Sequence, residues 1–139
     1  MTKIFVSTSY IFYPKVGDIR DSLEGLGFSV LLPSGYGKSI PSYRLRELNE
    51  EEFVKVKQDL FREDDKKVKE SDLLLVLNFD KTNQANCIGG AVFLEMFRAY
   101  QQQKPIYLYN PIPENNFRDE IRGLAPIVIN QDLTKIKLI

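Results

Sequence analysis

Short apolar runs alternate along the chain with longer segments in which apolar residues recur every three or four positions. The short runs are rich in β-branched and aromatic side chains, which is typical of buried strands. They predict strands at Lys3–Ser7, Phe28–Leu32, Leu73–Leu77, Pro105–Tyr109 and Ile127–Ile129. The helical periodicity predicts helices from after Pro14 to Leu26, over Leu45–Lys69 and Ala91–Gln103, and a short one within Pro113–Leu124.

Two of the connecting segments have a distinctive composition. Gly25 and Gly27 predict the end of the first helix, and the segment 33–41, rich in Gly, Pro and Ser, predicts a mobile loop. The long helix that follows this loop is highly charged, yet one side of it is apolar. This stripe consists of Phe53, Val56, Leu60 and Val68, and it is interrupted by a carboxylate at Asp64.

The order of these elements predicts the fold class. The strand Leu73–Leu77 has no polar alternation, as expected when helices cover both faces of a parallel sheet. Strands that alternate with helices favour parallel βαβ units with right-handed crossovers. We therefore expect an α/β three-layer sandwich with a five-stranded, parallel, doubly wound sheet of the flavodoxin-like or Rossmann-like type. At 139 residues, the chain fits one domain spanning 1–139.

The charge balance and the cysteine content narrow the class of protein. Nineteen basic residues balance nineteen acidic ones, so a nucleic acid polymer or a membrane surface is not an expected partner. A chain with so little net charge tolerates self-association. The single cysteine, Cys87, excludes an intrachain disulfide, and the N-terminus has neither a signal-peptide pattern nor a membrane-length apolar run. We expect a cytoplasmic protein, in which Cys87 is incidental.

The absence of histidine restricts the possible chemistry. It excludes catalytic systems of the Ser-His-Asp and Cys-His kind and histidine acid–base catalysis. With one cysteine and no histidine, a zinc site is not expected, and we predict neither a metal nor a cofactor. Catalysis has to use carboxylates, hydroxyls, Lys, Arg, Tyr or backbone dipoles.

Ligands of doubly wound sheets bind at the carboxyl ends of the strands. There, glycines that precede a helix let a ligand approach the backbone, although a glycine pair can equally form a plain turn. The residues at these ends that we predict to bind substrate are Ser7, Ser9, Tyr10, Asn78, Asp80, Gly89, Gly90 and Asn110.

Two carboxylates are the candidate catalytic residues. Glu95 lies about one turn inside the helix that follows Gly90, on a partly apolar face, which suits a poorly solvated nucleophile. The alternative is a solvated ion pair with Arg98. Asp64 interrupts an apolar stripe, where a carboxylate needs a partner, and it could orient another catalytic group. Its alternative is to face water within a charged run.

An ordered set of segments resembles the nucleoside 2-deoxyribosyltransferase-like superfamily, which includes deoxynucleoside 5′-monophosphate N-glycosidases. The set comprises Lys3–Ser9, Asp64, Ser71–Leu77, Gly89-Gly90 with Glu95, and Lys104–Leu108. The resemblance implies that Glu95 forms a covalent deoxyribosyl ester and that Asp64, eight residues before Asp72, positions it. It also implies a small-molecule nucleoside or nucleotide as substrate and a homodimer or higher oligomer that shares active sites between subunits.

The sequence departs from the family pattern near the nucleophile. The family places a glycine four residues before the glutamate, whereas Gly90 lies five before Glu95, and it places an Asp or Ser where this chain has Gly89. Three functions therefore remain open: glycosyl transfer or hydrolysis through Glu95, nucleotide binding without cleavage as a sensor, and cleavage of NAD in the manner of TIR-type domains, which the opening Lys3–Ser7 also resembles.

Overall fold

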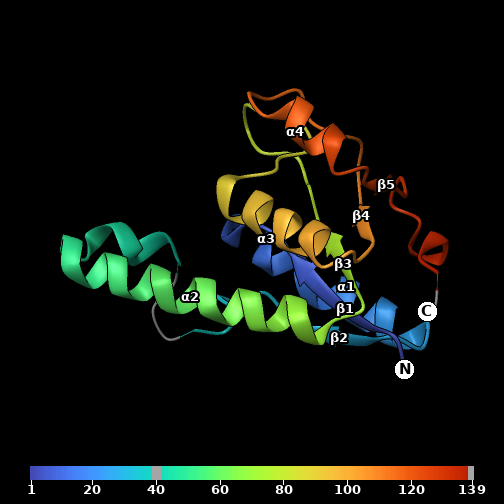
Figure 1. Cartoon of the computed structure of the whole chain (residues 1–139), viewed down its shortest axis with the longest axis horizontal. Coiled ribbons are helices and arrows are strands. Elements are labelled where there is room, and N and C mark those ends of the chain that lie inside the picture. The colour runs from blue at the N-terminus through green and yellow to red at the C-terminus, as the bar shows by residue number, and fades with distance from the viewer. Residues whose placement is uncertain (39–41, 138–139) are drawn as a thin grey trace.

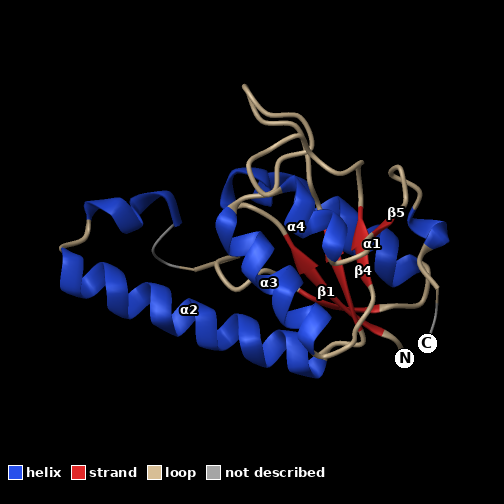
Figure 2. Ribbon diagram, turned by 45° about the horizontal axis from the view of Figure 1, so that its top comes forward, coloured by secondary structure: helices blue, strands red, loops and turns tan. Residues whose placement is uncertain are grey.

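The computed structural model of the chain describes residues 1–38 and 42–137 and contains a parallel five-stranded sheet between layers of helices (Figures 1 and 2). The strand order is β2-β1-β3-β4-β5, and each neighbouring pair is parallel. The doubly wound α/β fold predicted from the sequence is confirmed. The strands are β1 Lys3–Ser7, β2 Ser29–Leu31, β3 Leu73–Val76, β4 Ile106–Leu108 and β5 Ile127–Val128.

Helices connect these strands in chain order. The α-helices are α1 Val16–Gly25, α2 Glu50–Glu70, α3 Gly90–Gln101 and α4 Arg118–Gly123, and the 3₁₀ helices are η1 Tyr10–Lys15, η2 Ser42–Glu47 and η3 Leu133–Lys135. The first predicted helix begins later than expected, because η1 precedes it and α1 starts at Val16. Leu26 is the C-cap residue of α1 and is 42% exposed, so it does not belong to the apolar face of the helix. Residues 39–41 of the loop predicted to be mobile lie outside the described residues.

The predicted helix over Leu45–Lys69 is divided in two at Asn49. The Asn49 side chain accepts a hydrogen bond from the Glu52 backbone N–H at 2.9 Å and donates one to the Glu52 carboxylate at 2.9 Å. This reciprocal cap satisfies a free donor of the first helical turn and so fixes the start of α2 at Glu50. Three acidic residues in that turn further stabilise the start of the helix, because negative charge interacts favourably with the N-terminal end of the helix dipole.

The two faces of the sheet are covered by different helices. α1 and the C-terminal segment with Ile136 pack on one face, against Ile4, Val6 and Leu75. The helices α2, α3 and α4 pack on the other face; their buried residues there are Val68, Val92, Met96, Ala99 and Ile121. The chain moves outward from β1 to β2 and then back past β1 to β3, so right-handed connections place α1 opposite the later helices.

The N-terminal half of α2 projects beyond the sheet, together with η2 (Figures 1 and 2). We call these residues, 42–60, the arm. The 21-residue α2 is about 30 Å long, and its buried residues are Asp64 and Val68, both beyond the arm. The arm therefore does not contribute to the main core. Instead, it forms one side of a pocket at the carboxyl end of β1.

Candidate functional site

Two buried carboxyl groups meet between α2 and α3. Glu95, on the second turn of α3, and Asp64, on α2, are each only 7% exposed. Their side chains form a hydrogen bond with one another. Neither residue adopts the alternative that its sequence context allowed, because Asp64 does not face water and Glu95 is not a solvated ion pair. The two residues are 31 positions apart in the sequence, and no local pattern predicts that they are in contact.

Each carboxyl group also receives a hydroxyl hydrogen bond from the end of a strand. Ser7 is the last residue of β1, and its Oγ donates to Oε2 of Glu95. Ser34 follows β2, and its Oγ donates to Oδ1 of Asp64 at 2.5 Å. Because β1 and β2 are adjacent and parallel, their carboxyl ends bring the two hydroxyls to the same edge of the sheet. The acidic pair is therefore held from both sides.

Burial and mutual repulsion govern the ionisation of this pair. Burial raises the pKa of Glu95 well above its usual value, and the charge of Asp64 raises it further, while the hydrogen bond from Ser7 opposes the rise. Burial also raises the pKa of Asp64, against hydrogen bonds from Ser34 and Glu95. The two groups are coupled, so the free energy of ionising one depends on the protonation state of the other.

Arg98 supplies the positive charge nearest to the pair on α3. Its guanidinium lies over the ring of Phe61, 5.7 Å from the ring centroid, and its charge lowers the pKa of both Glu95 and Asp64. Its Nη1 atom is buried and has no hydrogen-bond partner among the described residues. Arg98 therefore acts on the acidic pair through its charge, without forming an ion pair with Glu95 in the described part of the chain.

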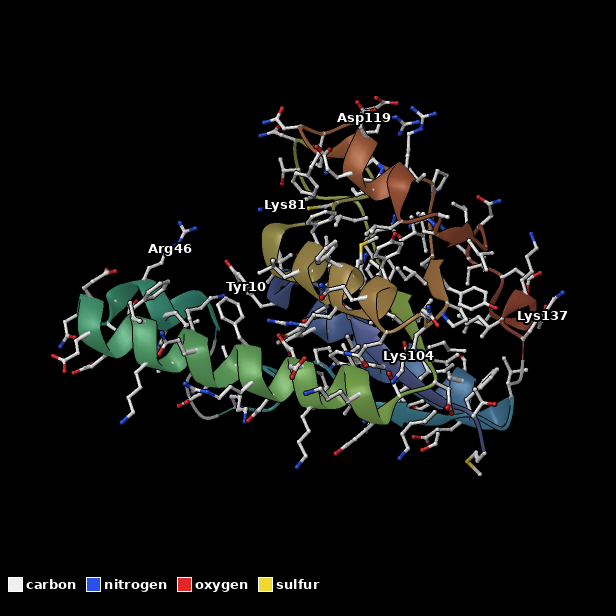
Figure 3. All side chains as sticks on the ribbon, viewed as in Figure 1. Tyr10, Arg46, Lys81, Lys104, Asp119 and Lys137 are labelled. Atoms are coloured by element: carbon white, nitrogen blue, oxygen red, sulfur yellow. The ribbon has the colours of Figure 1, made fainter. Side chains whose placement is uncertain are left out.

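A pocket of about 400 Å³ opens directly above the acidic pair. Its floor includes Asp64 and Glu95, and its walls come from four parts of the chain. These are η1 with the residues before it, the turn after β2, the arm with the adjoining turns of α2, and the start of α3. In Figure 3, Tyr10 of η1 lies between Arg46 on the arm and Lys81, which precedes α3. The size and lining suit a small molecule.

The start of α3 exposes bare backbone to this pocket. Gly89 is the N-cap residue and offers no side-chain cap, and both Gly89 and Gly90 line the pocket. An added Cβ at Gly89 would meet Ser9 Oγ at an ordinary 3.6 Å, and one at Gly90 would meet nothing within 4 Å. Steric need therefore does not explain the two glycines. Their effect is to leave the N–H groups of the first helical turn uncovered.

The structure places six of the ten predicted site residues on the pocket wall or floor and a seventh directly behind it. Those that line the pocket are Ser9, Tyr10, Asp64, Gly89, Gly90 and Glu95. Ser7 is fully buried behind Glu95, so its hydroxyl contacts the carboxylate. Asn78, Asp80 and Asn110 do not line the pocket.

Asn78 and Asn110 bond to one another instead, at the ends of β3 and β4. The Asn78 side chain donates to the backbone oxygen of Asn110 at 2.9 Å and accepts from its N–H at 2.8 Å, and the Asn110 side chain donates to the backbone oxygen of Asn78 at 3.1 Å. Asp80 accepts from the Asn86 N–H at 2.9 Å and so orders the loop before α3. All three have a structural reason to be polar.

Several pocket residues were missed by the sequence analysis. Ser34 follows β2, and the crevice rule applied to that strand end would have included it. On α2, Phe53, Lys57 and Phe61 recur every fourth position and face the pocket together with Asp64. Part of the apolar stripe predicted on this helix, Phe53 and Leu60, lines the wall of the pocket.

The described residues contain no group of three or more His, Cys, Asp or Glu side chains that could hold a metal ion. In the same part of the chain, no helix has the length and apolar character needed to cross a membrane. The acidic pair is thus the main chemical feature of the pocket.

Comparisons with known proteins relate this fold to enzymes that act on N-glycosidic bonds. No model of a known protein family and no curated protein matches the sequence. The structure is similar to that of a 2-deoxyribosyltransferase from Bacillus psychrosaccharolyticus, with a TM-score of 0.51 and 19% identity over 77% of this chain and 71% of that one. It is also similar to the CMP N-glycosidase BcmB from Clostridium botulinum, with a TM-score of 0.57 and 17% identity over 93% of this chain and 90% of that one. The fold is the one predicted from the family resemblance.

Proposed function

We propose that this chain, which shares the fold of a 2-deoxyribosyltransferase and a CMP N-glycosidase, cleaves or transfers at the N-glycosidic bond of a nucleoside or nucleotide. The observation that carries the proposal is the position of Glu95. Its carboxyl group is buried at the floor of an open pocket, held through one oxygen by Ser7, and in contact with a second acid. A carboxylate so placed can meet the anomeric carbon of a bound sugar.

In the proposed mechanism the pair holds one proton, initially on Glu95, and this gives the second acid a role in the first step. When a sugar binds above the pair, the proton moves from Glu95 to Asp64, so that Glu95 can attack as a carboxylate. A bond forms between a Glu95 oxygen and the anomeric carbon, while the bond from that carbon to the base nitrogen breaks and its electron pair leaves with the base. The proton on Asp64 passes to the departing base.

The second step restores the enzyme. The oxygen of a water molecule, or a nitrogen of a second base, attacks the anomeric carbon of the ester and displaces Glu95 as a carboxylate. The proton lost by the attacking group returns to the acidic pair. Two displacements at the same carbon retain its configuration, as in glycosidases that use two carboxyl groups. Hydrolysis and transfer differ only in which acceptor reaches the ester first.

The direct experiment measures release of the free base by chromatography. The wild-type chain is incubated with the common 2′-deoxynucleosides, with cytidine and with their 5′-monophosphates, and Glu95→Gln and Glu95→Asp are run beside it. We expect base release by the wild type and a loss of at least about 1000-fold in both variants, since the attacking group is removed or displaced. Full activity in Glu95→Gln would exclude Glu95 as the nucleophile.

A nucleotide sensor without catalysis is the second candidate. The raised pKa of Glu95 favours it, because a protonated carboxyl group is a poor nucleophile. Calorimetric binding of a nucleotide without base release over long incubation would support this alternative. Adding NAD to the same incubations and following nicotinamide release distinguishes the third function that the sequence left open.

We also propose that the chain forms a homodimer or higher oligomer. Leu94, Phe97 and Tyr100 of α3 are 43%, 43% and 52% exposed, although α3 is otherwise a core helix. The rings of Phe97 and Tyr100 are stacked, with centroids 6.0 Å apart, so they form one apolar patch. Light scattering should give at least twice the monomer mass and a lower mass for Phe97→Glu. A monomer at all concentrations would contradict this.

A further inference from the structure

Basic side chains line the pocket without acidic partners. They are Arg46 and Lys57 on the arm and Lys81 before α3, and none of them forms an ion pair in the described residues. The acidic residues in the same lining are Asp64 and Glu95 at the floor, and burial raises the pKa of both. The chain as a whole has no net charge, so the positive lining is a local feature of the pocket.

Several basic residues of α2 and of the loop before it do have acidic partners, unlike the basic residues that line the pocket. Arg62 pairs with Asp59 at 2.9 Å, Lys69 with Asp65 at 2.9 Å, and Lys38 of the preceding loop with Glu63 at 2.8 Å. These residues follow the ordinary pattern of an exposed, charged helix. Arg46 on η2 and Lys57 on α2 form no ion pair in the described residues and line the pocket, whereas Lys55, which also forms none there, is exposed outside it.

Lys57 occupies a position that a core-facing helix would fill with an apolar residue. It lies four residues after Phe53 and four before Phe61, and its ammonium is 5.2 Å from the centre of the Phe61 ring. It is also two helical turns before Asp64, or about 10 Å along the helix axis, on the same side. Its charge is thus presented to a molecule that sits over the acidic pair and extends toward the arm.

We propose that Lys57 and Arg46 form an anion subsite that binds the phosphate of a nucleoside 5′-phosphate. This inference rests on the proposed function for the position of the sugar, and it names the substrate class of the same pocket. A sugar over Glu95 has the base on one side and the 5′ group on the other. With its phosphate at the arm, the base lies on the side of Tyr10 and the start of α3. A phosphate accepts charge-assisted hydrogen bonds from both cations.

The test measures binding and cleavage separately. For binding, calorimetry uses the Glu95→Gln variant, which does not turn substrate over, with each 2′-deoxynucleoside and its 5′-monophosphate. We expect the monophosphate to bind at least about 100-fold more tightly than the nucleoside, as two charge-assisted bonds of about tenfold each allow. Adding Lys57→Gln or Arg46→Gln should reduce that ratio by about tenfold each.

Two other lysines serve as comparisons. Lys55 is exposed on the same helix outside the pocket, so Lys55→Gln removes an equal charge and should leave the ratio unchanged. Lys81 lies at the other end of the pocket. If Lys81→Gln reduces the ratio and the arm variants do not, the phosphate binds at the start of α3 and the arm subsite is wrong.

Failure of this inference can be told apart from failure of the proposed function. Base release at equal rates from nucleosides and monophosphates, with equal binding of both, would overturn the anion subsite and leave the Glu95 chemistry standing. Tight, Lys57-dependent binding of monophosphates with no base release would support the subsite and count against the enzyme. A preference for the monophosphate that is as large in the Lys57→Gln variant as in the Lys55→Gln variant would likewise overturn the subsite.

Discussion

Ser7, the last residue of β1, donates its hydroxyl hydrogen bond to Oε2 of Glu95, 88 residues later in the chain. The bond fixes one carboxylate oxygen against the edge of the sheet, while the Glu95 side chain also contacts Asp64 and lines the pocket. It also favours the ionised form of Glu95, because a donated hydrogen bond stabilises a carboxylate. Ser7, which the sequence analysis assigned to substrate binding, is thus placed where it can position the proposed nucleophile.

Replacing Ser7 by alanine tests this positioning role. Loss of the hydroxyl removes an effect that lowers the pKa of Glu95, so the acid side of the pH profile of kcat/KM should move to higher pH. We expect kcat/KM at neutral pH to fall by about tenfold or more, the value of one hydrogen bond to a charged group. Ser71→Ala is the matched control, because Ser71 is a buried serine whose side chain donates to the backbone oxygen of Val68, away from the acidic pair. An unchanged profile in Ser7→Ala would contradict the role.

The free energy of unfolding of Glu95→Gln should increase relative to that of the wild type as the pH rises. Because the pKa of Glu95 is raised in the folded chain, the folded state holds the proton more tightly than the unfolded state does. Its contribution to stability is therefore present at low pH and is lost as the pH rises from the ordinary glutamate pKa through the raised one. Each tenfold change in proton affinity is worth about 1.4 kcal/mol.

Urea unfolding of wild type and Glu95→Gln, measured from pH 5 to pH 8, checks this. The variant should gain on the wild type steadily across this range, since the amide cannot ionise. A constant difference in the free energy of unfolding at every pH would mean that Glu95 is not buried as a shared acid.

The proposed proton transfer from Asp64 predicts a dependence on the leaving group. Asp64→Asn should slow base release from ordinary 2′-deoxynucleotides by about 100-fold or more, within the range of general acid catalysis. The loss should be much smaller for a 7-methylguanine nucleotide, whose base carries a positive charge and leaves without a proton. Single-turnover rates on both substrates measure the difference. Equal losses would restrict Asp64 to holding Glu95 in place.

The Asn78–Asn110 contact predicts a loss of stability. Asn78 is fully buried, and Asn78→Ala leaves a backbone N–H and a backbone oxygen of Asn110 without partners. We expect the free energy of unfolding to fall by about 2 kcal/mol or more. Asp80→Ala, which removes one bond to the exposed Asn86 N–H, should cost less. If Asn78→Ala instead raised KM with an unchanged melting temperature, the sequence-based substrate role would be right.

Most of the fold could be predicted from the sequence because its signals are local. The run Leu73–Leu77 could only be a strand buried on both faces, and the glycines at 25 and 27 end α1 where the structure ends it; Gly27 has a φ of +95°. The break at Asn49 was missed although the capping residues are present. Helical periodicity continues through η2 into α2, and the pattern of apolar residues alone does not register a change from 3₁₀ to α geometry.

The candidate site was only partly predictable, for a physical reason. The acidic pair could be suspected because a carboxylate on an apolar stripe needs a partner, and Asp64 has one in Glu95. Which polar residues face a pocket depends on how helices cross, and no local pattern encodes that. Asn78 and Ser34 both follow strands, yet Asn78 pairs with Asn110 while Ser34 bonds to the acidic pair.

The most direct measurement of the central claim is the mass of the protein during turnover. The chain is incubated briefly with mixed 2′-deoxynucleosides and their 5′-monophosphates, quenched in acid, and analysed by intact mass and peptide mapping. The account predicts a mass increase equal to one deoxyribosyl or deoxyribosyl-phosphate group, located on the peptide that contains Glu95 and absent in Glu95→Gln. Base release without any adduct, or an adduct on another residue, would contradict it.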